Sequence, residues 1–184
     1  MIEIVPWMRR EFTFDLGVGV FPALLERLRG TPARAERLIM GIPEEMLATH
    51  PNGKWSVKDH LGHLVDLGAL DERRLREFLG RAKVLSGADS SNRATERGNH
   101  RETPVAGILR KLRVGREELV HKLDALTEEE VGISAVHPRL QTSMRVIDWV
   151  YFVAEHDDHH LAMARRAILS ASGKAVTDRE EARK

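Results

Sequence analysis

The sequence predicts an all-α protein, a four-helix bundle built around one core. Apolar side chains recur at steps of three and four residues in four long segments, as amphipathic helices require. Runs that alternate apolar and polar residues, the pattern of half-buried strands, are nearly absent. The 42% hydrophobic and 31% charged fractions are typical of an ordinary soluble globular protein. A length of 184 residues suits a single domain with short tails.

The first helical segment follows an N-terminal extension, residues 1–18. Its opening stretch, "FPALLERLRG", ends at Gly30. Thr31 followed by Pro32 is then an N-cap and first-turn signal that restarts a helix through "ARAERLIM". One kinked helix or two short helices would both fit this pattern.

The second helical segment begins after Trp55, with Ser56 as its expected N-cap. A polar stretch, residues 86–102, follows it and is too long for an ordinary turn between helices. We therefore expect this stretch to be mobile or to belong to a site. The apolar stripe of the helix comprises Val57, Leu61, Leu64, Gly68 and Leu75.

The third helix opens at Thr103 and Pro104, and the fourth is expected from Val146 to Leu169. Residues 127–145 between them predict an irregular connection. The bundle domain should span residues 19–172, because residues 173–184 lack an apolar stripe and predict a flexible tail. Four amphipathic helices of this kind pack most simply as a four-helix bundle. The apolar face of the third helix comprises Val105, Ile108, Leu112, Leu119, Leu123 and Leu126.

Charge and composition exclude several classes of function. The 29 Lys and Arg residues nearly balance 28 Asp and Glu residues, so no global field draws the chain to nucleic acid or to an anionic membrane. No apolar run approaches the roughly 20 residues that span a bilayer, and no secretory signal pattern opens the chain. A cytoplasmic location is the resulting expectation. Cysteine is absent, so any thiol chemistry would need an external thiol.

The fourth helix carries histidines inside an apolar pattern. Steps of four and three place His156 and His160 on the stripe that faces the core, whereas His159 falls on a more polar face. Two imidazoles one turn apart can hold one divalent cation, although the glutamate of the H-E-x-x-H motif is missing. The alternative is a histidine pair that hydrogen-bonds within a polar core. The metal interpretation is favoured, because buried imidazoles without partners are costly.

Catalytic tetrahedral metal sites have three protein ligands and one open position, so a third ligand is expected. The second helix offers two candidates. His60 lies beside the apolar stripe and is slightly favoured by the pattern, while His63 lies at its border. Asp59 and Asp157 are possible partners for the outer N–H groups of ligating histidines, although on most helices such residues are solvated, and that alternative is favoured.

Other polar residues have a weaker case. Trp55 is expected to be a packing anchor at the start of its helix. Glu118-x-x-His121 resembles half of a di-iron motif, but its second half is missing. The remaining histidines, His50, His121 and His137, are expected at the surface or at helix caps. Four residues of the long polar stretch could line a metal site or simply be solvated: Asn92, Arg93, Asn99 and His100.

The segment "WSVKDHLGHLVD", followed much later by "AEHDDHHLAMAR", resembles the DinB-like superfamily. In that family a Trp-Ser start is followed by a histidine eight residues after the tryptophan, which is His63 here. An H-x3-H pair on the last helix supplies two further ligands, matching His156 and His160. The stretch "ADSSNRATERGNH" is also similar to the inter-helix segment of some members. The resemblance runs from about Leu24 to Ile168.

The resemblance implies an up-down-down-up bundle with a divalent metal at one end, ligated by His63, His156 and His160. Imidazole ligands suit zinc, nickel, copper or iron, and manganese is a further candidate; zinc and nickel are favoured. The implied chemistry is thiol S-transfer, with an external low-molecular-weight thiol, or hydrolysis of a small electrophilic substrate. A homodimer is also implied. The alternatives are a non-catalytic metal-binding stress or scaffold dimer, and a bundle whose histidines only complete a polar core.

Overall fold

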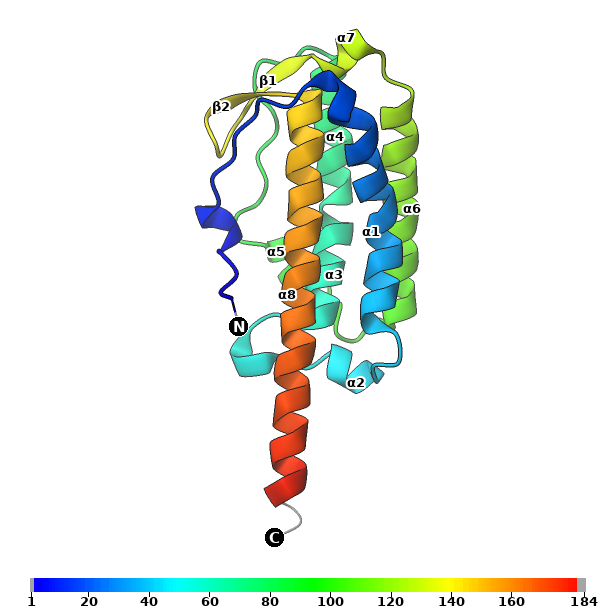
Figure 1. The fold of residues 1–184 in the computed structure, drawn as a ribbon, viewed down its shortest axis with the longest axis vertical. Coiled ribbons are helices and arrows are strands. Elements are labelled where there is room, and N and C mark those ends of the chain that lie inside the picture. The colour runs from blue at the N-terminus through cyan, green and yellow to red at the C-terminus, as the bar shows by residue number, and fades with distance from the viewer. Residues whose placement is uncertain (1, 182–184) are drawn as a thin grey trace.

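The computed structural model describes residues 2–181, apart from the side chains of Asn52 and of residues 174–181. Four long helical segments form the bundle shown in Figure 1, which confirms the predicted fold class. They are α1 (Phe21–Ile39), the pair α3 (Val57–Asp66) and α4 (Gly68–Leu79), α6 (Val105–Asp124) and α8 (Val146–Glu181). None of the described helices is both long enough and apolar enough to span a bilayer.

The direction of the helices explains the long polar connection. In Figure 1, α1 and α8 run one way along the bundle while α3, α4 and α6 run the other way. Both α1 and α3 pack against α6 and α8. Because α4 ends at one end of the bundle and α6 begins at the other, residues 80–104 must travel its whole length. The short helix α5 (Arg93–Arg97) lies within this connection.

The first helical segment, whose course was ambiguous in the sequence, is resolved, and the second differs from the single helix that was predicted. Pro32 lies inside α1, which continues through it as a single helix. The second segment is divided at Leu67 into α3 and α4. Ser56 is the N-cap of α3, as predicted, and forms a capping box with Asp59: the Asp59 N–H donates to Ser56 Oγ at 3.1 Å and the Ser56 N–H donates to Asp59 Oδ2 at 2.9 Å.

The prediction of an irregular connection over residues 127–145 was wrong. This segment contains α7 (Glu128–Val131) and an antiparallel hairpin of β1 (Ser134–His137) and β2 (Thr142–Arg145). Each strand has four residues, which is too short to establish an alternating pattern in the sequence. Val84 forms a parallel bridge to Val136, so the start of the long connection is tied to this hairpin.

The remaining short elements lie outside the bundle helices. They are α2 (Glu44–Leu47) and three 3-10 helices at Trp7–Arg9, Val18–Val20 and Pro51–Gly53. The helix α8 extends beyond the predicted end at Leu169. Residues 182–184 and the side chains from residue 174 onward lie outside the described part, so the expected flexibility of residues 173–184 stays a prediction.

The core consists of two apolar clusters with a polar layer between them. One cluster surrounds Leu28, Phe78 and Trp149, and the other surrounds Leu61 and Leu112. Along α8 the first cluster ends at Ala154 and the second begins at Ala164. Buried polar groups need partners, so this layer is where a site is expected. Its buried polar members include His63, Asp71, Arg116, His156, Asp157 and His160.

The N-terminal extension packs along α8 (Figure 1). The aromatic rings of Trp7, Phe12 and Phe14 lie against the first apolar cluster. Arg10 forms an ion pair with Glu155 of α8, which fixes the extension beside the polar layer.

Candidate metal centre

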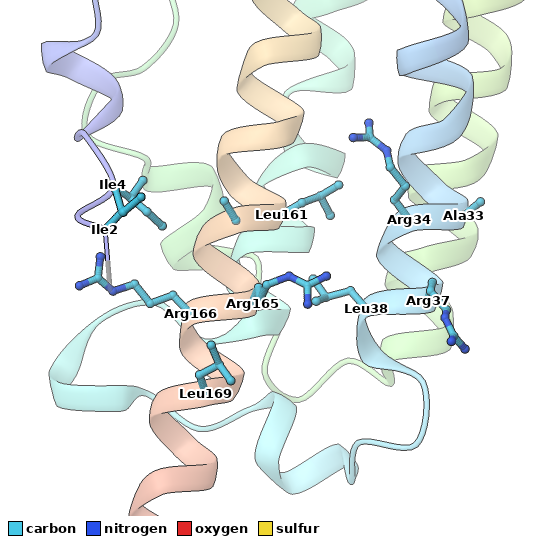
Figure 2. A pocket seen from close by; sticks show the side chains of 11 residues that line it. Ile2, Ile4, Ala33, Arg34, Arg37, Leu38, Leu161, Arg165, Arg166 and Leu169 are labelled. Carbon is cyan, nitrogen blue, oxygen red and sulfur yellow. The ribbon is translucent and has the colours of Figure 1, made fainter.

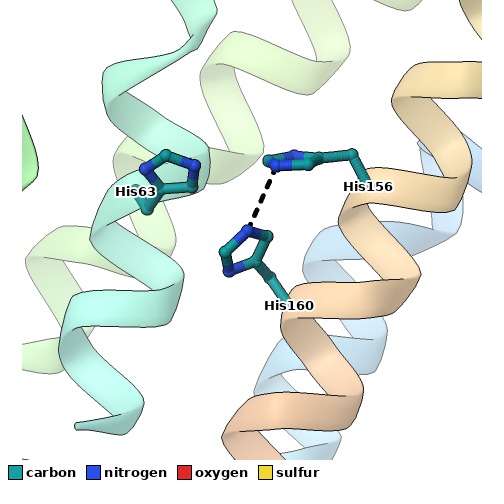
Figure 3. Close-up of side chains that lie close together, drawn as sticks. All are labelled: His63, His156 and His160. Atoms are coloured by element: carbon teal, nitrogen blue, oxygen red, sulfur yellow. Dashed lines mark hydrogen bonds between the residues drawn. The ribbon is translucent and has the colours of Figure 1, made fainter. Parts of the chain in front are cut away.

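The structure brings His63, His156 and His160 together. Each of these buried residues offers one ring nitrogen, and the three nitrogens lie within 4.8 Å of one another. His156 and His160 project from successive turns of α8, and His63 faces them from α3 (Figure 3). The Nε2 atoms of His156 and His160 are 3.1 Å apart. The resemblance implied a site at one end of the bundle, but the histidines lie in the layer between the two apolar clusters.

The outer nitrogens of two of these rings have neutral partners. The Nδ1 atom of His63 is 2.9 Å from the hydroxyl oxygen of Thr95, which lies on α5. The Nδ1 atom of His160 is 3.0 Å from Nδ1 of His60. If these outer nitrogens carry the ring protons, the Nε2 lone pairs of His63 and His160 are directed into the shared space. His60, the other candidate from the sequence, therefore supports a member of the cluster.

The histidines of the cluster are held in the neutral form. Burial lowers the pKa of His63 to about 4, although nearby Asp66 partly opposes this. Burial also lowers the pKa of His156 and of His160 well below the ordinary value, and neighbouring histidines add to the effect. Neutral imidazoles have the free lone pair that a metal ligand needs.

The donor set fits a divalent transition metal. Two nitrogens bound tetrahedrally at about 2.0–2.1 Å from zinc would be separated by about 3.3 Å. The 3.1 Å between the paired Nε2 atoms is close to that value. Three imidazoles leave one tetrahedral position open, which is the arrangement of catalytic rather than structural sites. His63, His156 and His160 could therefore hold such a cation.

Two tryptophans form the walls of the cluster. The ring centroid of Trp55 is 5.0 Å from that of His63 and 6.0 Å from that of His160. On the other side, the ring centroid of Trp7 is 4.7 Å from that of His156. The three histidines retain 6–8% exposure, so these walls do not seal the cluster completely. Trp55 is thus a packing residue, as the sequence predicted, but the rings it packs against are those of the site.

The two aspartates considered as outer partners bond elsewhere. Both carboxylate oxygens of Asp157 accept hydrogen bonds from Arg116, at 3.0 Å from Nε and 2.7 Å from Nη2. Arg116 also donates to Asp71 at 3.0 Å, which completes a buried ion triad in the polar layer. Asp59 is occupied by the capping box and lies 2.6 Å from Nε2 of His50.

The long connection contributes to the site through a residue that the sequence analysis missed. Thr95 is buried against His63, but no periodicity or motif distinguishes it from its polar neighbours. His100 is buried too, and its Nε2 lies 2.9 Å from Asp66. The other three residues considered there have different roles: Asn92 occupies the N-cap position of α5 without a side-chain capping bond, Arg93 pairs with Asp89, and Asn99 donates to Glu102.

The other histidines divide into exposed and buried. His121 is exposed on α6, as predicted, and His50 is half-buried near Asp59. His137 is only 2% exposed, so its expected place at the surface or at a cap was wrong. His137 ends β1, and the hairpin that buries it has no clear signature in the sequence.

A separate groove of about 760 Å³ lies between α1, α8 and the N-terminal segment (Figure 2). Leu38, Leu161 and Leu169 line it together with four arginines, Arg34, Arg37, Arg165 and Arg166. None of the clustered histidines lines this groove, so it is distinct from the candidate metal centre.

Fold and site together define a class of protein: a four-helix bundle with a buried three-histidine cluster that could bind a metal ion. The family comparison gives this class a name. The chain belongs to the DinB superfamily, whose family model matches residues 27–164. No curated protein matches the sequence.

A solved structure has the same fold. YfiT from Bacillus subtilis aligns with a TM-score of 0.75 and 17% sequence identity, over 90% of this chain and 93% of that protein. YfiT is described as "a probable metal-dependent hydrolase with an unusual four-helix bundle topology". At this identity the likeness establishes the shared fold.

Proposed function

We propose that this DinB-superfamily protein is a metal-dependent enzyme that acts on a small electrophilic substrate, by hydrolysis or by transfer to an external low-molecular-weight thiol. His63, His156 and His160 are the proposed ligands of a divalent cation, with zinc or nickel favoured over manganese and iron. The observation that carries the proposal is the convergence of three buried ring nitrogens within 4.8 Å. The description of YfiT as a probable metal-dependent hydrolase supports the same chemistry.

A divalent cation at this position supplies a Lewis acid and lowers the pKa of a water or thiol ligand toward neutrality. The protein's own residues prepare the position for it. Burial keeps the imidazoles neutral, and Thr95 and His60 orient the rings of His63 and His160. Trp7 and Trp55 restrict water around the cluster, which strengthens the electrostatic interactions inside it.

Metal content tests the ligand assignment directly. Protein purified without a histidine tag and loaded separately with zinc, nickel, manganese or iron should bind about one equivalent of the preferred ion. Replacing a ligand by alanine (His63→Ala, His156→Ala or His160→Ala) should abolish stoichiometric binding, because two imidazoles hold a cation far less tightly than three. His121→Ala, at an exposed position on α6, is the matched control and should retain the metal. Stoichiometric metal in each of the three ligand variants would contradict the assignment.

Turnover separates an enzyme from a metal-binding protein without catalysis. The metal-loaded protein is to be screened against small esters, amides and alkylating electrophiles, with and without glutathione, mycothiol and bacillithiol. We expect turnover that is lost in His160→Ala. Metal binding without turnover on any substrate would favour the stress or scaffold interpretation. The proposed homodimer is tested on the same samples by light scattering.

A further inference from the structure

Arg74 is a buried arginine that forms no direct ion pair with a carboxylate of the described residues. This residue of α4 is 4% exposed, and its Nε donates to the backbone oxygen of Ser86 at 3.0 Å. No ion pair with Arg74 is found among the residues that the structure describes. The two carboxylates whose charges raise its pKa hydrogen-bond to other groups: Asp71 accepts from Arg116 and Glu77 accepts from Ser86. The charges of Asp71 and Glu77 therefore stabilise the Arg74 cation without a direct ion pair, and Arg74 contributes a buried positive charge to this end of the bundle.

Arg139, just after β1, has a hydrogen-bond donor without a partner. Its Nη2 is buried and has no hydrogen-bond partner in the described part of the chain, and its Nη1 contacts only the sulfur of Met8 at 3.7 Å. The guanidinium carbon lies 5.6 Å from the centroid of the Phe152 ring and 5.8 Å from that of Trp7. The aromatic faces therefore hold this cation in place and leave hydrogen-bond donors free.

His137 adds a second unpaired donor. Its Nδ1 accepts a hydrogen bond from the backbone N–H of Leu140 at 3.2 Å, so the proton of the neutral ring is on Nε2. That Nε2 is buried and has no acceptor among the described residues. The His137 ring lies 5.1 Å from the same Phe152 ring that Arg139 covers.

The electrostatics agree with this grouping. Burial, together with the positive charges of Arg74 and Arg139, lowers the pKa of His137 to about 4. The pKa of Arg74 is lowered chiefly by burial, with Arg139 contributing, although Asp71 and Glu77 oppose the change. Two cations and a neutral N–H donor thus lie close enough to influence one another.

We propose that Nη2 of Arg139 and Nε2 of His137, with the positive charge of Arg74 nearby, form a binding site for an oxyanion, the acidic group of a small substrate or thiol cofactor. The site adjoins the metal centre, because the Trp7 ring contacts both Arg139 and His156. Phe152, beneath the donors, also lies one helical turn before His156. This inference deepens the proposed function: the molecules that reach the histidines carry a carboxylate, phosphate or sulfonate group.

The test measures anion binding by the metal-free full-length protein. Sulfate, phosphate and acetate are the probes, and each titration is monitored by calorimetry at constant ionic strength. We expect saturable binding of at least one probe. Arg139→Gln should weaken that binding at least tenfold, and Arg139→Lys should weaken it less, because it keeps the charge. Tetrahedral and planar probes distinguish a phosphate or sulfonate ligand from a carboxylate. The control is Arg166→Gln, which removes the same charge from the separate groove shown in Figure 2 and should bind as the original protein does.

The variants remain informative if Arg139 also stabilises the fold. Circular dichroism and unfolding midpoints show whether Arg139→Gln is folded at the temperature of the titration, and Arg139→Lys provides a second folded comparison. Absence of saturable binding for all three probes, or equal affinities in Arg139→Gln and the original protein, would overturn the proposal. Because the titration uses metal-free protein, failure of the metal assignment would leave its result unchanged.

Discussion

Thr95 and His60 are unusual partners for ligand-type histidines. Ligating imidazoles commonly donate their outer N–H to a carboxylate or a backbone carbonyl. Here the partner of His63 is a hydroxyl, and the partner of His160 is another imidazole that is itself neutral, since burial lowers the pKa of His60 to about 4. Neutral partners add no negative charge, so a cation in this site would keep more of its charge available to a substrate.

Thr95→Val tests this role at the scale of a single residue. Valine has nearly the same shape but cannot accept a hydrogen bond from His63, so the ring loses its orientation. We expect the affinity for the preferred metal to fall by about ten- to a hundredfold, measured by competition with a chelating dye. Thr103→Val, in the same connection, removes a hydroxyl that donates to the backbone oxygen of Asn99, and it should leave the affinity unchanged. Equal affinities in the two variants would show that Thr95 has no positioning role.

At the scale of the elements, the contact between α3 and α5 depends on Gly62. A Cβ atom at this position would lie 2.2 Å from Cγ of the His100 ring, much closer than real contacts allow. The absence of a side chain lets the long connection approach α3 and places Thr95 against His63. The close approach of His100 thus explains why a glycine lies in the interior of α3.

Gly62→Ala should therefore destabilise the fold by about 1–3 kcal/mol and weaken metal binding as well, because His100 must move and α5 moves with it. Gly115→Ala is the matched control, since it is also inside a helix but a Cβ there meets nothing within 4 Å. Alanine at position 115 should stabilise the protein by about 0.5–1 kcal/mol through its better helix propensity. Urea unfolding of both variants gives the comparison. If Gly62→Ala leaves the free energy of unfolding unchanged, α5 is not packed against α3 as described.

At the scale of the whole molecule, the buried histidines make stability depend on pH. Burial lowers the pKa of His60, His63 and His137 from the ordinary 6.5 to about 4. Between these values the unfolded chain binds protons that the folded chain does not, so stability falls as the pH falls from about 6.5 toward 4. For each group, every unit by which folding lowers the pKa corresponds to a loss of about 1.4 kcal/mol in the free energy of unfolding once the pH has fallen below both pKa values.

Urea unfolding of the metal-free protein at pH 7.5, 6.5, 5.5 and 4.5 should give midpoints that change little above pH 6.5 and then decrease. His137→Gln should reduce this dependence by removing one depressed group, whereas His121→Ala, at an exposed position, should leave it unchanged. A midpoint that stays constant down to pH 4.5 would contradict the burial of neutral histidines.

The sequence determined the bundle and the inward direction of His156 and His160, because helical periodicity is a local property that a pattern of side chains records. The N-cap at Ser56 was equally local, and the structure confirms it. The choice between His60 and His63 could not be made from the local sequence pattern. Periodicity placed both near the apolar stripe, and only the packing of α3 against α8 decided which ring joins the pair.

Tertiary structure alone placed the partners of these rings. Thr95 and Trp7 reach the histidines across long stretches of chain, and the unpaired donors of Arg139 and His137 lie beside Phe152 only once the hairpin has folded. Contacts between residues distant in sequence have no periodicity. They arise from the direction in which each helix runs, and here the long connection along the bundle and the short hairpin at its end set that arrangement.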